Sequence, residues 1–227
     1  MAAATPRFSA DTLKFLRSLK RNNRRDWFNA HRDDYEAHVR QPTIAIIERL
    51  ADDLRAFAPE HVASPKVSMF RIYRDTRFSE NKTPYKTHVA ARFPTRGLLK
   101  NEGGGLYFSV SPEEFWIGGG VYGPQPPQLL GIRQHISSHL KQFRAIAESP
   151  RFKKTFGALQ GERLQRVPRG FAKDDPAAEY LKMKQLYAGA EHPPAMATGP
   201  LFYPTLLNTF RELVPLVRFL NAPALKG

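Results

Sequence analysis

The sequence contains no cysteine, which excludes disulfide bonds, thiolate-ligated metal sites and cysteine-based catalysis. It also contains no apolar run near the roughly 20 residues that a membrane-spanning helix requires. The first residues, MAAATPRFSADTLKF, lack the apolar core of a signal peptide. From these absences we expect a soluble, cytoplasmic protein without a membrane partner.

Acidic residues are scarce, with 21 Asp and Glu against 35 Lys and Arg, and the formal net charge is +14. Such an excess favours anionic partners: nucleic acid, phosphorylated metabolites or an acidic protein surface. Half of the excess falls in residues 66–100, which hold nine basic and two acidic residues. The seven histidines are scattered and form no HExxH motif, so we expect no metal site. The sequence indicates no particular cofactor.

The periodicity of apolar residues divides the chain into three parts. Residues 1–60 repeat at helical spacing, residues 66–117 alternate as strands do, and residues 128–220 are mainly helical again. A length of 227 residues is sufficient for one sizeable domain and short for two. We therefore predict an α+β fold, with helices packed on a mostly antiparallel sheet, as a single domain over residues 1–227. The oligomeric state is left open.

Local signals place several element boundaries. Ser9 is a predicted N-cap, Asn22 and Asn23 end the first helix, and Pro42 suits the first turn of a later one. One long helix is predicted from Leu129 to Ile146. Pro215 should kink the last helix or split it in two. Alternation predicts strands over residues 67–73, 85–93, 106–110 and 115–117.

The stretch RIYRDTRFSENKTPYK, residues 71–86, has the highest density of functional side chains. Its pattern predicts a strand, a ten-residue loop from Asp75 to Pro84, and a second strand. A loop of that length between strands is a common place for a functional site. If the strands pair, basic groups near their ends converge, and arginine suits bidentate recognition of phosphate or carboxylate.

These residue types suggest an anion-binding site, which would make the protein a binder of, or an enzyme acting on, an acidic or phosphorylated ligand. Asp75 would orient a neighbour or act as a base, and Tyr85 is the predicted acid. The supporting residues are Asn81, Tyr73 and His88. The predicted anion-binding residues are Arg71, Arg74, Arg77, Lys82 and Lys86.

The same residues carry a family likeness. The pattern RxxRDxRFSxNKxPYK over residues 71–86 resembles the hallmark of the family called domain of unknown function 2461, in which the position of Asn81 is Asp or Asn. The similarity extends to NNRRDWF, FWIGGGVYGPQPPQL, RLQRVPRGF and DPAAEYLKMK, and so covers nearly the whole chain. The resemblance implies which residues matter and implies no particular activity.

Other interpretations of the basic cluster stay open. An arginine–aspartate network could simply brace the long loop. A nucleic-acid-binding module could use the same surface, with Tyr73, Phe78 and Tyr85 as stacking platforms. An interaction protein could dock an acidic partner there. A nuclease of the ExK type is disfavoured, because Asp75 lies too close to Glu80 for the two acids to lie on successive strands.

Overall fold

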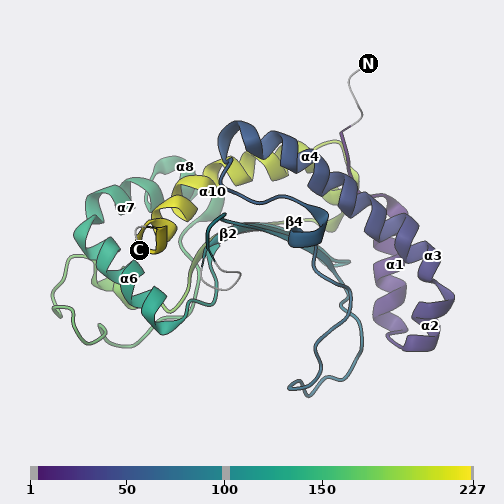
Figure 1. Ribbon diagram of the computed structural model, residues 1–227, viewed down its shortest axis with the longest axis horizontal. Helices are drawn as coiled ribbons and strands as arrows, with labels where there is room; N and C mark the ends of the chain where they lie inside the picture. Colours follow the sequence, from purple (N-terminus) through teal and green to yellow (C-terminus); the bar gives the residue numbers. More distant parts are fainter. Residues whose placement is uncertain (1–4, 99–102, 226–227) are drawn as a thin grey trace. The chain divides into compact units, whose positions relative to one another are not determined.

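The computed structural model describes residues 5–98 and 103–225, and it confirms the α+β class (Figure 1). Helices pack against one open, antiparallel, four-stranded sheet with strand order β1-β2-β3-β4. The prediction that residues 1–227 form a single domain stays a prediction. The strands are β1 Val89–Pro94, β2 Gly105–Val110, β3 Phe115–Val121 and β4 Leu186–His192. The helices of the first part are α1 Ala10–Arg21, α2 Arg25–Ala30, α3 Arg32–Tyr35, η1 Glu36–Arg40, α4 Gln41–Phe57 and α5 Pro65–Ser68. The later helices are α6 Pro126–Ser138, α7 Leu140–Ala147, α8 Pro150–Phe156, α9 Ala178–Leu181, η2 Pro194–Thr198 and α10 Phe202–Leu225.

Capping residues set the first helix as the sequence predicts. Ser9 Oγ accepts a hydrogen bond from the Thr12 amide at 3.3 Å, and Thr12 Oγ1 accepts one from the Ser9 amide at 3.2 Å. This reciprocal pair satisfies donors that a helix start otherwise leaves free. Asn22 ends the helix, as predicted.

One turn of π-helix, η1, lies between α3 and α4. The Gln41 amide bonds the Glu36 carbonyl, five residues back, instead of the usual four. The Thr12 hydroxyl donates to the His38 carbonyl within this turn at 2.6 Å, which ties α1 to η1. The Thr43 hydroxyl donates to the Val39 carbonyl at 2.7 Å, so side chains supply partners where the helical ladder changes.

The contacts divide the chain into two compact units. The first comprises residues up to Phe93 together with Tyr107–Ile117 and Glu191–Asn208. Its core is rich in aromatic rings at the start of α10: the Phe202 ring centroid lies 4.9 Å from that of Phe115 and 5.4 Å from that of Phe8. Rings of this size supply much of the apolar area that a core buries.

The second unit comprises Pro94–Leu106, Gly118–Ala190 and the chain from Thr209. Inside it Asn221, only 1% exposed, accepts a hydrogen bond from the Gly104 amide at 2.7 Å and donates to Thr95 Oγ1 at 2.8 Å and to the Gly104 carbonyl at 3.2 Å. Its side-chain amide is thereby matched on both its oxygen and its nitrogen.

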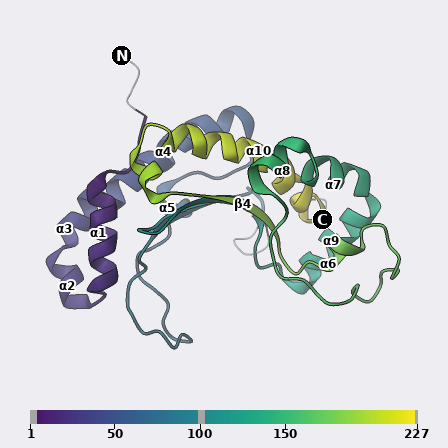
Figure 2. The same ribbon diagram turned by 180° about the vertical axis from the view of Figure 1, so that it is seen from behind.

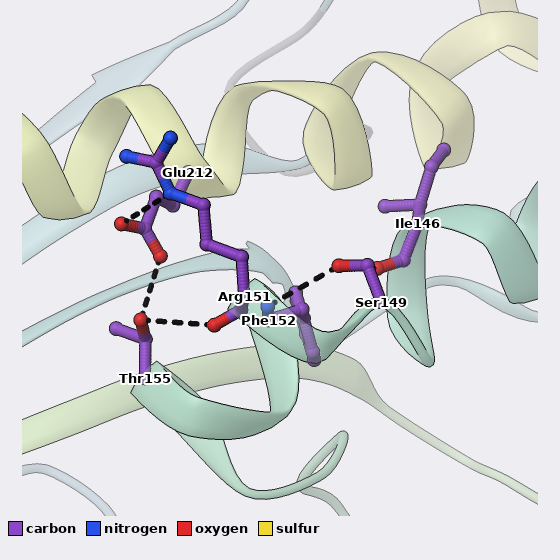
Figure 3. A network of polar contacts seen from close by, with 6 residues as sticks. All are labelled: Ile146, Ser149, Arg151, Phe152, Thr155 and Glu212. Carbon is purple, nitrogen blue, oxygen red and sulfur yellow. Dashed lines mark hydrogen bonds and ion pairs between the residues drawn. The ribbon is translucent and has the colours of Figure 1, made fainter.

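A second polar network in this unit joins α8 to α10 (Figure 3). Arg151 Nε and Thr155 Oγ1 both donate to the Glu212 carboxylate, at 2.9 and 2.7 Å. Ser149 caps α8 by accepting from the Phe152 amide at 3.2 Å. The cap thus fixes the N-terminal end of α8, and the bonds to Glu212 join the helix to α10.

Strand predictions need several corrections. Residues 67–73 do not form a continuous strand: α5 ends at Ser68, and the rest pairs only through isolated bridges. The second predicted strand, 85–93, is a regular strand only from Val89. β4 was not predicted, because its sequence LYAGAEH is rich in small residues with weak strand preference. The strands predicted at 106–110 and 115–117 are confirmed as β2 and β3.

Two helix predictions also need correction. The predicted helix from Leu129 to Ile146 is interrupted at His139, whose φ of −126° is not helical, although the apolar stripe continues across the break. Conversely, α10 passes through Pro215 as one helix, so of the two predicted outcomes the split is wrong and the kink stays a prediction. Buried neighbours on both sides of the proline, among them Val214 and Leu216, favour the unbroken helix. No helix among the described residues is long and apolar enough to cross a membrane.

Candidate functional site

The two segments flanking the loop pair in the antiparallel sense, which is the condition under which their basic groups could converge. Tyr73 and Tyr85 form a bridge, the Arg74 amide donates to the Pro84 carbonyl at 2.9 Å, and the Lys86 amide donates to the Ile72 carbonyl at 2.8 Å. The loop between them extends away from the strands and can be followed in both ribbon views (Figures 1 and 2). The backbone pairing of the two flanking segments therefore fixes both ends of the long loop.

Asn23, just after α1, fastens the base of the loop to the helices. Its Nδ2 donates to the Tyr85 carbonyl at 2.9 Å, and its Oδ1 accepts from the Tyr85 amide at 3.0 Å. The side-chain amide thus imitates the two bonds that a neighbouring strand would make. The sequence indicated Asn23 as a helix end and as part of the family-like stretch NNRRDWF.

An aromatic cluster lies under the same bridge. Tyr85 stacks on Phe28 with ring centroids 4.1 Å apart, and the Tyr73 ring lies 5.4 Å from Tyr85 and 6.3 Å from Phe28. Tyr85 is only 3% exposed, and burial raises the pKa of its phenol, whereas Tyr73 keeps 45% of its surface exposed. Of these rings, Tyr73 is the one that a ligand can reach over a large area.

A cleft of about 310 Å³ opens beside this cluster. Arg25 and Asn29 line it from α2, while Tyr73, Arg74 and Tyr85 line it from the loop base. Thr76 and Pro84 complete the wall, which we call the Arg74 cleft. Two of its lining residues are arginines and none is acidic.

Hydroxyl groups hold the Arg74 side chain. Its Nη1 donates to Thr83 Oγ1 at 2.5 Å and its Nη2 to Ser79 Oγ at 3.3 Å. Thr83 Oγ1 in turn donates to Asn81 Oδ1 at 2.7 Å, and Asn81 Oδ1 also accepts the Thr83 amide at 3.0 Å. Asn81 therefore positions Arg74 through Thr83, a role that needs only an acceptor oxygen.

The loop's carboxylate is occupied elsewhere. Asp75 accepts from Arg77 Nε at 3.0 Å and Nη2 at 2.8 Å, and it also accepts the Arg77 amide at 3.2 Å. These bonds to Arg77, with a smaller contribution from the charge of Arg71, lower the pKa of Asp75 from 3.8 to about 2. Arg74, by contrast, forms no ion pair with any carboxylate that the structure describes.

A second cleft, of about 280 Å³, shares Tyr73 with the first. Three arginines line it: Arg71 from the loop base, Arg32 from α3 and Arg40 from η1. Glu36 also lines it and pairs with Arg40 at 3.1 Å. The remaining lining residues are apolar or aromatic, and we call this the Arg71 cleft. The other lining residues are Phe28, Tyr35, Pro65, Met69, Phe70 and Ile72.

The remaining predicted residues lie near the loop but line neither cleft. Lys82 Nζ donates to the Thr76 carbonyl at 3.0 Å. Lys86 Nζ lies 4.9 Å from the Phe70 ring centroid, and burial, with the charge of Arg71, lowers its pKa. Half-buried His88 follows; burial and the charge of Lys86 lower its pKa.

The tip of the loop carries an unusual apolar residue. Phe78 is 95% exposed, and the guanidinium of Arg77 lies 5.7 Å from its ring centroid. Single exposed apolar side chains are common on protein surfaces, but an almost bare phenylalanine on a basic loop is a ready contact for a planar partner.

The predicted residues thus divide into groups. Arg74, Tyr73 and Tyr85 meet in one cleft, and Arg71 joins Tyr73 in the other. Asp75 pairs with Arg77. Sequence reasoning missed the contributions of the helices. The available signal was the family-like NNRRDWF, residues 22–28, which includes only Arg25 of the missed residues. The missed lining residues are Arg25, Asn29, Arg32 and Arg40.

A sequence model of the family described as Conserved hypothetical protein (DUF2461) matches residues 11–219. The chain belongs to this family. No curated protein and no solved structure matches it. The DUF2461 match includes α2 and the whole loop, so both clefts lie within the family's span. Among residues 5–98 and 103–225, no group of three or more His, Asp or Glu side chains is arranged to hold a metal ion.

Proposed function

We propose that this DUF2461 protein binds a phosphorylated or otherwise acidic ligand in the Arg74 cleft. The observation that carries the proposal is the pairing pattern of the loop. Asp75 is occupied by Arg77, while Arg74 is held by two neutral hydroxyls and lines a cleft without acidic residues. A cation that is positioned yet unneutralised is what an anion site requires.

The donors in the cleft fit a planar or tetrahedral anion. A guanidinium has five N–H groups, and the bonds to Thr83 and Ser79 use two of those of Arg74. Arg25 faces the same cleft from α2 and forms no ion pair with a described carboxylate. Asn29 and Thr76 add neutral polar groups. In this proposal Arg74 and Arg25 bind the anion, and Asn29 helps to orient it.

Asp75 serves as an orienting group in this site, through its bonds to Arg77. A general base works best with a pKa near the working pH, and the pKa of Asp75 is about 2. Tyr85 is buried with a raised pKa, which suits a wall of the cleft that keeps its proton. The residues of the cleft therefore suit ligand binding better than acid–base catalysis. An enzymatic step would require a reacting group supplied by the ligand or by another side chain.

A second candidate function is favoured by Phe78. Its exposure at the tip, beside Arg77 and on a strongly basic chain, suits stacking on a base of single-stranded nucleic acid. Binding of this kind weakens with salt, by roughly 0.7 log unit per log unit of salt for each phosphate contacted on a single strand. Loss of oligonucleotide affinity in Phe78→Ser, at unchanged pyrophosphate affinity, would support this second function.

The test of the main proposal is calorimetric titration with inorganic pyrophosphate at fixed ionic strength. Arg74→Gln should weaken binding by roughly tenfold or more, because charged hydrogen bonds contribute about 1.5–3 kcal/mol each. Arg77→Gln is the matched control, since it removes the same charge from the same loop but from an arginine that is already paired. Its effect should be less than about twofold.

Two results would overturn the proposal. One is the absence of saturable pyrophosphate binding. The other is an equal loss in Arg74→Gln and Arg77→Gln, because equal losses mean diffuse attraction to a basic surface.

A further inference from the structure

Tyr73 lines both the Arg74 cleft and the Arg71 cleft, and each cleft carries its own arginines. Arg74 and Arg25 lie in the first, and Arg71 lies in the second with Arg32 and Arg40. An exposed aromatic ring thus stands between two separate cationic pockets. A ligand that uses the whole surface must therefore have a group that packs on the ring as well as anionic groups that bind the arginines.

The helical side of the site shows the same division. Asn29 lines the Arg74 cleft and Arg32 the Arg71 cleft, and Arg32 Nη2 donates to Asn29 Oδ1 at 3.0 Å. Phe28, which lines the Arg71 cleft, stacks on Tyr85, which lines the Arg74 cleft. The clefts are therefore adjacent: residues of their walls contact one another, and Tyr73 lines both.

We infer that the ligand is a nucleoside flanked by phosphates on both its 5′ and its 3′ side, with the base stacked on Tyr73 and one phosphate in each cleft. This inference rests on the proposed function and adds the ligand's class. A base is planar and neutral, so it suits a tyrosine that is 45% exposed and backed by Phe28 and Tyr85. Phosphates suit arginines because of their bidentate geometry.

The charges favour two separate anionic groups over one. Glu36 neutralises Arg40 in the Arg71 cleft, which leaves Arg71 and Arg32 for a phosphate there. Arg74 and Arg25 remain for the other phosphate. A single phosphate would use one pair of arginines and leave the second pair without a counter-charge. Such a ligand occurs either free, as a nucleoside 3′,5′-bisphosphate, or within a single strand of nucleic acid.

The experiment compares thymidine 3′,5′-bisphosphate with thymidine 5′-monophosphate, inorganic pyrophosphate and the base-free deoxyribose 3,5-bisphosphate. Wild-type protein should bind the thymidine bisphosphate at least about tenfold more tightly than the base-free sugar, given the usual contribution of base stacking. A similar advantage is expected over the monophosphate, because that ligand lacks the phosphate that would form charged hydrogen bonds in the second cleft. Arg71→Gln should remove the advantage over the monophosphate. Tyr73→Leu should remove the advantage over the base-free sugar, and Tyr73→Phe should keep it.

Controls separate this inference from the proposed function. Pyrophosphate binding that depends on Arg74 but comes with no preference for the thymidine bisphosphate overturns the inference and leaves the proposed function standing. Equal weakening of mono- and bisphosphate by Arg71→Gln overturns it as well. Tetrathymidylate distinguishes the two sources: affinity no greater than that of the bisphosphate indicates a free nucleotide, and markedly greater affinity indicates a strand. Arg77→Gln should leave the preference unchanged.

Discussion

Two polar sites in this protein contrast in how their hydrogen bonds are used. Around Asn221, in the second unit, the side-chain amide is buried and bonds Gly104 and Thr95 on both its oxygen and its nitrogen. In the Arg74 cleft, two arginines face solvent, and they have N–H groups that could still donate to a ligand. The first arrangement leaves nothing for a partner to bind, whereas the second leaves charge unmatched.

The two sites differ in the property to which they contribute: the Asn221 site to stability, and the Arg74 cleft to the proposed ligand binding. Buried polar groups are costly unless matched, so a fully matched amide fixes chain segments that are far apart in sequence. An unmatched cation near others contributes little to stability, and functional sites often carry such groups. Substitutions at the first site should change the free energy of unfolding, and substitutions at the second should change ligand affinity.

The largest effect is expected from Asn221→Leu. The change leaves the Gly104 amide and carbonyl and the Thr95 hydroxyl without their Asn221 partner, and each buried unsatisfied group costs about 1–3 kcal/mol. We expect a loss of roughly 2–4 kcal/mol in the free energy of unfolding, measured by urea denaturation. For a chain of this size, that corresponds to roughly 4–16 °C in melting temperature.

The matched control is Asn208→Leu, on the exposed side of the same helix, α10. Its effect should stay within about 0.5 kcal/mol. Equal destabilisation by both substitutions would mean that the hydrogen bonds of Asn221 add no stability beyond that of an exposed asparagine. The contrast with the Arg74 cleft would then be lost. Anion affinity should be unchanged in either variant.

An intermediate effect is expected from Asn23→Ala. This variant tests whether one residue can contribute both to stability and to the geometry of the binding cleft. The substitution removes both bonds to the Tyr85 backbone, so we expect a loss of about 1–2 kcal/mol of stability. Because Tyr85 forms the base of the loop, pyrophosphate affinity should also fall. Asn22→Ala is the control: Asn22 bonds Ser18 within α1, so affinity should not change. Lost stability with unaltered affinity would show that the loop base does not position the cleft.

The smallest effect concerns the pH dependence of Asp75. Its folded-state pKa, about 2, lies below the ordinary value of 3.8, so its pairing with Arg77 stabilises the fold above about pH 4. That contribution is lost as pH falls from 4 to 2. An NMR titration should give a pKa near 2, and Arg77→Gln should return it towards 3.8. An unchanged pKa in that variant would mean that groups other than Arg77 lower it, and would weaken the contrast with Arg74.

Much of the fold could be predicted from local chemistry. The Ser9 cap, the end of the helix at Asn22 and the position of Pro42 in the first turn of α4 follow from rules that depend on neighbouring residues only. β4 was missed because its identity comes from pairing with residues far along the chain. There Gly120, with φ of +132°, lies so close to Leu186 that a Cβ would come within 2.4 Å of its carbonyl oxygen.

The candidate site could be predicted only in part, for a similar reason. Residues 71–86 stand out in the sequence by their charge density. The pairing of the flanking segments, which the sequence left as a condition, occurs through the isolated Tyr73–Tyr85 bridge. Sequence alone could not decide which arginine Asp75 would bond, because Arg71, Arg74 and Arg77 are all within a few residues. Nor could it bring Arg25 beside Arg74, since that proximity depends on the tertiary bonds of Asn23.

The π-helical turn at Glu36–Arg40 lies between α3 and α4 in one continuous helical run. It changes the direction in which the side chains before it point relative to those after it. Successive residues of an α-helix are turned by about 100°, so one inserted residue re-aims everything before it relative to everything after it. Arg32 and Tyr35 can therefore face the Arg71 cleft while Ile46 and Leu50 face the core. A one-residue deletion here would preserve the helical content yet rotate one set of side chains away from its target.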